Sequence, residues 1–209
     1  MGPALWTADP EIYAVVDPIG LGSHLDMLHE SPLCMGIAHV MDNQFWVFDG
    51  LNRALVFYDF RQDHGPGMDD HSDGIIHRYV EGQVTRVPNV PSHLVVDKNT
   101  GYVYVADTGN ARVGWMDPAA GTRGTRLQAR EPGTQHYRYN GAEVLDVVPQ
   151  SSGILTSPSG IELHDGILWV SDNATSRLHA FSMTGEPLNH LDTGLPAGSL
   201  MGIAFGPDD

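Results

Sequence analysis

Two histidines and several aspartates gather in one short acidic stretch of the sequence, residues 63–74. The candidate metal ligands in it are His64, Asp69, His71 and Asp73. From Asp69 to Gly74 the spacing imitates the D-x-D-x-D-G opening of a calcium loop, although position twelve is Val80 where such a loop closes with Glu. Zinc and copper accept imidazole and carboxylate ligands together. A solvated acidic loop is the commoner explanation of such a stretch, and a metal site for Ca²⁺ or Zn²⁺ with these ligands is the alternative that we carry forward.

A second stretch, residues 118–141, concentrates positive charge on a chain with 26 acidic and 11 basic residues. Four of the ten arginines lie in it: Arg123, Arg126, Arg130 and Arg138. A guanidinium group can grip a carboxylate or phosphate through two parallel hydrogen bonds. These arginines are therefore candidates for an anion-binding site. The interpretation that we favour is that they pair with the acidic body of the protein, including residues 63–73 if the two stretches meet.

The elements that must position these residues form a sequence repeat. Each unit has a short apolar strand, an aromatic and β-branched strand that ends in Asp, a polar turn and a third strand. The three second strands of the units are Phe45–Asp49, Val103–Asp107 and Leu168–Asp172. We place the units near residues 35–91, 92–158 and 159–200, with a fourth split between 201–209 and 1–34. His24-Leu25-Asp26 precedes Met35 by the same interval at which His190-Leu191-Asp192 precedes Met201, which supports this split.

Strands that arrive in threes and fours without helical periodicity predict an all-β fold, a β-propeller. Residues 90–97, followed by 102–113, resemble an NHL repeat, whose blade has a P-x-G-(I/V)-A-V-D strand and a V-A-D-x-x-N-x-R-(I/V) hairpin. The segments at 32–59 and 157–182 resemble it more loosely. The resemblance implies one domain over residues 1–209 made of NHL-type blades. The chain is then either a fragment of a longer, six-bladed propeller or a closed four-bladed ring.

One histidine departs from the repeat near the expected propeller axis. His93 stands where the other units have Gly36, Gly160 and Gly202. Peptidylglycine amidating lyases are similar to NHL propellers, and the resemblance implies axial histidines that hold zinc. A catalytic zinc site needs three protein ligands, and the sequence offers one at the axis. His93 is therefore our axial-face candidate, with a packed structural histidine as the alternative.

The Asp that closes each second strand invites a catalytic interpretation, but every unit has one. An Asp at a strand end accepts backbone N–H groups of the following turn. Arg53, Arg112 and Arg177 follow closely and can pair with these aspartates. We therefore predict structural roles for them.

Composition limits the partners of this chain. Its formal net charge of −15 opposes binding to phosphate backbones and anionic lipids, so we expect no nucleic acid partner and no membrane insertion. A single cysteine excludes an internal disulfide. The acidic, lysine-poor composition favours an extracellular or periplasmic location.

The preferred function is a module or scaffold that binds a protein, a peptide or a small molecule. The ligand would lie at the axial mouth or on the blade-edge loops. The alternative is a metal-dependent lyase or hydrolase with its site at the propeller axis. Whether the chain is an enzyme stays open at this point.

Overall fold

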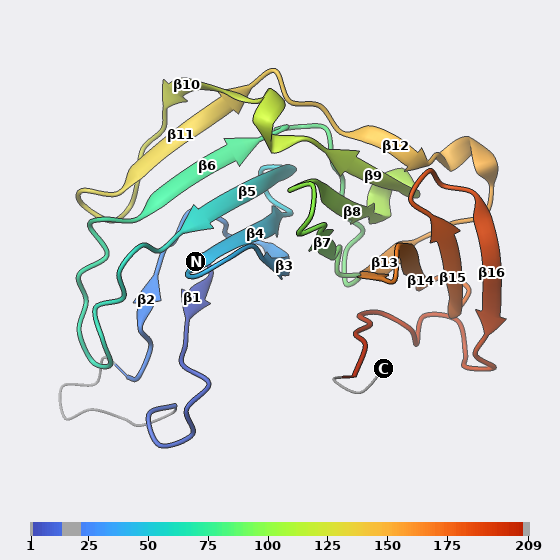
Figure 1. The fold of residues 1–209 in the computed structure, drawn as a ribbon, viewed down its shortest axis with the longest axis horizontal. Helices are drawn as coiled ribbons and strands as arrows, with labels where there is room; N and C mark the ends of the chain where they lie inside the picture. Colours follow the sequence, from blue (N-terminus) through green and yellow to red (C-terminus); the bar gives the residue numbers. More distant parts are fainter. Residues whose placement is uncertain (1, 14–21, 207–209) are drawn as a thin grey trace.

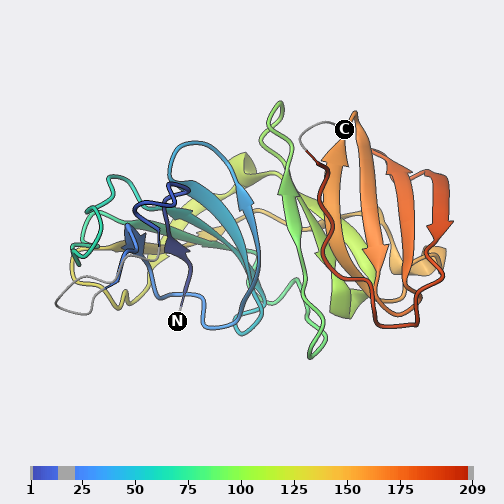
Figure 2. The ribbon, with the colours of Figure 1, turned by 90° about the horizontal axis from the view of Figure 1, so that it is seen from below.

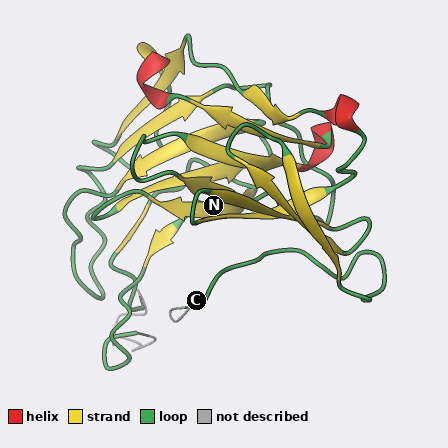
Figure 3. Cartoon of the chain, turned by 45° about the vertical axis from the view of Figure 1, so that its right-hand side comes forward, coloured by secondary structure: helices red, strands yellow, loops and turns green. Residues whose placement is uncertain are grey.

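The computed structural model describes residues 2–13 and 22–206, and strands dominate it (Figure 1). Three sheets follow one another along an open arc, as blades do in a propeller. The described helices are short 3₁₀ turns (Figure 3): η1 (Thr108–Asn110), η2 (Pro118–Ala120) and η3 (Gln150–Ser152). None of the helices in these ranges has the length and apolar character needed to cross a membrane. The predicted all-β fold class is confirmed.

The third blade is the simplest of the three. Its four antiparallel strands follow the chain order: β13 (Pro158–His164), β14 (Ile167–Asp172), β15 (Arg177–Ser182) and β16 (Pro187–Asp192). The two-residue turn at Asp165 and Gly166 has positive φ at both positions, 50° and 72°, as a tight hairpin between twisted strands requires. All residues of β16 are exposed, so this blade ends in an uncovered outer strand.

The second blade is buried on both faces. Its strands are β7 (Leu94–Val96), β8 (Val103–Asp107), β9 (Arg112–Met116) and β12 (Leu145–Val148). Successive side chains of a strand point to opposite faces. On β8, Val103 and Val105 therefore pack in the core shared with the first blade, whereas Tyr104 and Ala106 pack in the core shared with the third. The aromatic and β-branched second strands of the repeat thus hold neighbouring blades together.

The first blade has six strands instead of four. Its own strands are β3 (Cys34–His39), β4 (Gln44–Asp49), β5 (Ala54–Asp59) and β6 (Ile75–Tyr79). Two more come from the 118–141 stretch of the second unit: β10 (Thr122–Arg126) and β11 (Gln135–Asn140). β11 pairs with β6 in parallel, and β10 pairs with β11 antiparallel. The second unit therefore extends the outer edge of the first blade, an arrangement that the sequence repeat did not predict.

The two parts of the split unit lie at different ends of the arc (Figure 2). β1 (Ala4–Leu5) and β2 (Asp26–Met27) pair with each other beside the first blade, where Leu28 is buried. Residues 201–206 run beside β13, and a Cβ added at Gly160 would lie 2.4 Å from the Met201 carbonyl oxygen. The joining of these segments into one blade stays a prediction.

Candidate metal centre

Three histidines from two distant parts of the chain converge beside the first blade. His24 precedes β2, and His64 and His71 lie in the connection between β5 and β6. Each offers one ring nitrogen, and these ligand atoms all lie within 4.8 Å of one another. The backbone brings the segments together, because the N–H of His64 donates to the carbonyl of Leu25 at 3.0 Å. Figure 1 shows β2 beside this connection.

The hydrogen bonds of His64 fix which nitrogen is available. Its Nδ1 lies 2.6 Å from the carbonyl oxygen of Gly65. A carbonyl oxygen only accepts, so Nδ1 carries the proton and Nε2 carries the lone pair. Nε2 is buried and has no hydrogen-bond partner in the described part of the chain. An imidazole in this tautomer is the form that ligates a metal ion.

His71 is oriented by a buried carboxylate. Its Nδ1 lies 2.8 Å from Oδ1 of Asp26, a residue with no exposed surface. The backbone N–H of Met27 also points at this nitrogen, but at the longer distance of 3.3 Å. Burial raises the pKa of Asp26, and the hydrogen bond with His71 opposes that rise. A carboxylate behind Nδ1 is the usual outer support of a metal-binding histidine, and it leaves Nε2 for the ion.

The structure brings together only part of the ligand set predicted from the sequence. His64 and His71 meet, but Asp69 and Asp73 are exposed and lie outside the group. The carboxylate of Asp73 instead accepts the N–H of Gln62 at 3.2 Å. The third histidine, His24, was missed as a ligand. Its one sequence signal was the His-Leu-Asp triplet shared with residues 190–192.

The 118–141 stretch covers the same connection, so the two charged stretches do meet. The Thr134 hydroxyl donates to the carbonyl of His71 at 2.9 Å. The N–H of Gln135, at the start of β11, donates to the carbonyl of Gly74 at 2.9 Å. The strand that widens the first blade therefore also fixes the end of the connection that carries His71.

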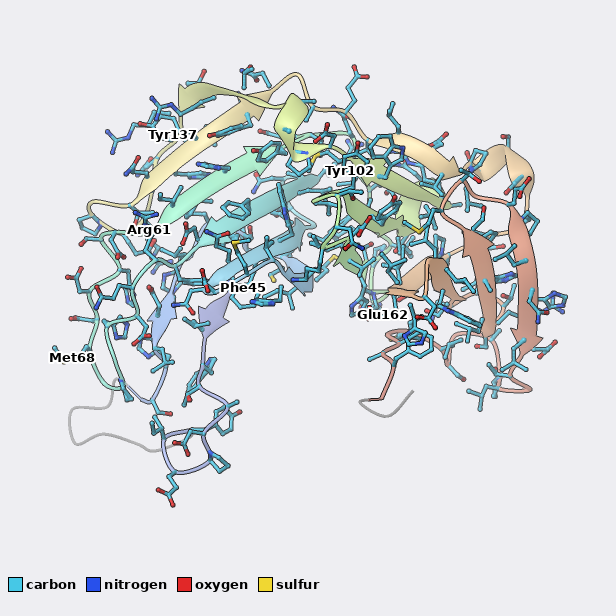
Figure 4. The ribbon with its side chains drawn as sticks, in the orientation of Figure 1. Phe45, Arg61, Met68, Tyr102, Tyr137 and Glu162 are labelled. Atoms are coloured by element: carbon cyan, nitrogen blue, oxygen red, sulfur yellow. The ribbon has the colours of Figure 1, made fainter. Side chains whose placement is uncertain are left out.

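The four arginines of this stretch do not converge on one point. Arg138 pairs with Glu81 at 2.8 Å, and the Arg123 guanidinium lies 4.7 Å from the centre of the Tyr137 ring, on β11 (Figure 4). Arg126 and Arg130 are exposed. Of these contacts, that of Arg138 with Glu81 is the kind of acidic pairing that the intramolecular interpretation predicts, and anion binding stays a prediction.

His93 has a different environment from the three clustered histidines. A Cβ built at Gly202 would lie 3.4 Å from its Nε2, so the ring packs against the backbone of the C-terminal segment. Burial lowers its pKa. Within residues 2–13 and 22–206, the three-histidine cluster is the one metal-type group of His, Cys, Asp or Glu, and it does not include His93. An axial metal site at His93 thus gains no second ligand there.

A hollow of about 380 Å³ lies along the inner strands β3, β7 and β13, at the predicted axial mouth. Apolar side chains of β7 form part of it, and the polar side chains at its edge are His39, Lys98 and Glu162. Lys98 is the single lysine of the chain, and its ammonium group donates to the backbone carbonyls of His39 and Val40. This lysine therefore joins neighbouring blades.

The repeated aspartates have the contacts of structural residues. Asp107 is fully buried, accepts the N–H of Thr85 at 2.7 Å and pairs with Arg112 at 2.8 Å. Asp49 and Asp172, equally buried, accept backbone N–H groups of neighbouring turns. These contacts agree with the structural roles predicted from the repeat.

Two solved structures are similar to this chain in fold. One is described as a streptogramin B lyase: it is 14% identical with a TM-score of 0.50, and the match covers 84% of this chain and 45% of that one. The other is virginiamycin B lyase from Staphylococcus aureus, 16% identical with a TM-score of 0.41, matched over 87% of this chain and 63% of that one. The chain thus spans about half the length of the first, 45%. Neither a protein-family model nor a curated protein sequence matches it. At this identity the likeness establishes the fold, a β-propeller.

Proposed function

We propose that this protein is a metal-binding β-propeller module that holds Zn²⁺ or a similar divalent transition-metal ion through His24, His64 and His71. The observation that carries the proposal is the buried Nε2 of His64, which has no hydrogen-bond partner in the described chain, on a ring whose ligand atom lies within 4.8 Å of those of His24 and His71. Imidazole nitrogens favour zinc, copper and nickel, whereas calcium requires oxygen ligands. The cluster therefore supports Zn²⁺ rather than Ca²⁺.

The separation of the ligand atoms sets a requirement for binding. Zinc binds imidazole at about 2.0–2.1 Å in a tetrahedral arrangement, which places the nitrogens roughly 3.3 Å apart. The three ligand atoms lie within 4.8 Å of one another, so the distances between them must shorten by up to about 1.5 Å when the ion binds. His64 and His71 lie in an irregular connection, which can make this adjustment more easily than a strand can.

The wider role is that of a binding module of NHL type. Residues 90–113 support this finer assignment, because their strand and hairpin follow the NHL pattern. A protein, a peptide or a small molecule would bind along the inner strands or the blade-edge loops, and we place the protein outside the cytoplasm. The negative charge of the chain suits partners that carry positive charge.

A metal-dependent lyase or hydrolase is the second candidate function. Three imidazoles are the ligand number of zinc sites that keep a fourth position for water or substrate, and three histidines cluster here. The reaction centre would then be this cluster and not His93. Hydrolysis of p-nitrophenyl acetate by the zinc-loaded protein, lost in His64→Ala, would support this candidate.

The test of the proposed function is metal titration of chelator-washed full-length protein, followed by elemental analysis after dialysis. We expect one equivalent of Zn²⁺, and His64→Ala should weaken binding on the order of 100-fold or more, since even outer-shell changes cost 10–100-fold. His190→Ala is the matched control, because His190 occupies the repeat position of His24 on the exposed strand β16. Full zinc retention in His64→Ala, or zinc loss in Asp69→Ala/Asp73→Ala, would contradict the proposal.

A further inference from the structure

We propose that the ion at this centre acts as a clasp, which fastens an N-terminal hairpin and an acidic connection to the first blade; this inference rests on the proposed function. The N-terminal hairpin consists of residues 2–13 and 22–27, with strands β1 and β2. The acidic connection consists of residues 60–74, between β5 and β6. His24 belongs to the hairpin, and His64 and His71 belong to the connection, so one ion would join the two.

In its described residues, the N-terminal hairpin has very short strands and large apolar side chains that stay partly exposed. Its strands β1 and β2 have two residues each, and a two-stranded ribbon of this length is marginal in water. Two of its large apolar side chains, Trp6 and Tyr13, remain about half exposed. Leu5 packs only partly against the core of the first blade. The hairpin therefore needs another attachment.

The acidic connection has the same need. Residues 60–74 contain no strand and no helix, and connections of this length usually have a special reason for their order. Four exposed aspartates repel one another in it: Asp63, Asp69, Asp70 and Asp73. Met68, at its outer edge, is 58% exposed (Figure 4). A divalent cation would offset the repulsion and also fix the course of the backbone.

The contacts between the two segments run through the ligands or their immediate neighbours. The N–H of His64 donates to the carbonyl of Leu25, and the Nδ1 of His71 donates to the carboxylate of Asp26. An ion bound here would close chain loops of about 40 and 47 residues, from His24 to each of the other ligands. In the chain-entropy account, a cross-link over loops of this length restricts the open state strongly.

The region that the clasp controls has a definite boundary. Leu28 is fully buried in the core of the first blade, and the Ser31 hydroxyl lies 2.7 Å from that of Tyr58. His29 pairs with Glu131 of the covering stretch. Residues from Leu28 onward therefore stay in place without the ion. On the other side, Thr134 holds the His71 carbonyl, so release of the acidic connection should end near residue 70.

Hydrogen exchange followed by mass spectrometry tests the clasp on full-length protein, with zinc and after chelation. The reporting amides are those of Leu25, bonded to Leu5, and His64, bonded to Leu25. On zinc removal we expect exchange to rise at least 10-fold in residues 22–27 and 61–70. Exchange in β7–β9 and β13–β16 should not change. His64→Ala with zinc should resemble the metal-free protein, and His190→Ala should respond like the unaltered chain.

A third variant separates the loss of a ligand from the loss of the histidine. His64→Cys keeps a zinc ligand, because thiolate binds zinc well, so it should restore the zinc-dependent protection that His64→Ala lacks. The outcomes also distinguish this inference from the one on which it rests. If one zinc ion binds but residues 22–27 and 61–70 keep the same exchange rates, the clasp is wrong and the metal site stands. Equal protection of all three blades would also overturn the clasp. Failure to bind zinc would reject the proposed function itself.

Discussion

The first and third blades use the same four-strand plan but differ in the connection between their third and fourth strands. In the third blade this connection is residues 183–186, and β16 beyond it is exposed along its length. In the first blade it is residues 60–74, and β6 beyond it is covered by β11. The shared strands explain the fold, and the longer connection supplies two of the three clustered histidines. In this protein most of the candidate site therefore lies outside the repeated strands, and His24 is its one contribution from a repeat position.

Two histidines at the same repeat position show the consequence. His24 and His190 both belong to a His-Leu-Asp triplet that leads into the next unit. His24 is buried beside His64 and His71, whereas His190 lies exposed on β16, where its ring centre is 6.1 Å from that of His179. The same residue type thus has different surroundings, because the connection of residues 60–74 reaches His24 and the short connection of residues 183–186 in the third blade carries no histidine.

The largest effect on the free energy of unfolding should come from a residue of the repeated strands. Asp107→Ala removes a fully buried carboxylate that pairs with Arg112 and accepts the N–H of Thr85, so it leaves the guanidinium with Asp146 as its one acidic partner and a buried N–H without its acceptor. We expect a loss of about 3–5 kcal/mol in the free energy of unfolding, measured by denaturant titration. Asp146→Ala is the matched control, because Asp146 pairs with the same arginine at 2.7 Å but its side chain is 46% exposed. Equal losses in both variants would contradict a dominant role for the buried aspartate.

The next largest effect on stability should come from the acidic connection, residues 60–74, and it should appear only when metal is present. A ligand that binds the folded state alone stabilises it by about 2.7 kcal/mol at a free concentration of 100 times its Kd. We expect zinc at that excess to raise the free energy of unfolding of the chain and of His190→Ala by this amount. His64→Ala should gain nothing. If zinc stabilised His64→Ala by the same amount, the connection of the first blade would not be the metal site, and the proposed difference in function between the first and third blades would be wrong.

A smaller effect should appear as pH dependence, because β11 covers the fourth strand of the first blade. Burial lowers the pKa of His77 on β6 to about 4, and Arg123 adds to the shift while Asp59 opposes it. The unfolded chain binds this proton near pH 6.5, and the folded chain binds it only near pH 4. Stability is therefore present above pH 6.5 and falls as the pH drops through this window.

Comparison with His77→Gln isolates this contribution. Between pH 6.5 and 5, the free energy of unfolding of the variant should fall by about 1 kcal/mol less than that of the unaltered chain. This figure allows for solvent screening, because His77 is only partly buried. Denaturant titrations at the two pH values measure the difference. An unchanged loss in His77→Gln would show that β11 does not protect this ring.

The sequence predicted the second strands of the repeat, but it did not predict that β11 pairs with β6. Phe45–Asp49, Val103–Asp107 and Leu168–Asp172 all fall within β4, β8 and β14, because alternating apolar residues and turn residues are local signals. The parallel pairing of β11 with β6 has no such signal. It joins strands that belong to different repeat units, and only the packing of the whole chain determines it.

The sequence predicted only part of the candidate site, because local composition does not show which distant segments meet. His64 and His71 lie close together in the sequence, so their composition alone drew attention to residues 63–74. His24 is about 40 residues away, and the backbone contact of His64 with Leu25 brings it near. Asp69 and Asp73 have the spacing of metal ligands but are exposed. Spacing predicts which ligands are available, and the backbone hydrogen bonds decide which of them meet.

The smallest effect concerns the arginines on the strands that widen the first blade. Arg138 pairs with Glu81 at the surface, where both side chains are about 40% exposed, 42% and 36%. Such pairs contribute about 0–1 kcal/mol, so Arg138→Ala should lower the free energy of unfolding by less than about 1 kcal/mol. A double-mutant cycle with Glu81→Ala should give a coupling energy of about 0.5 kcal/mol. If the coupling were zero and sulfate stabilised the unaltered chain but not Arg138→Ala, the arginine would be serving an anion instead. The covering strands would then carry a binding site of their own, and the first blade would differ from the third in two functions instead of one.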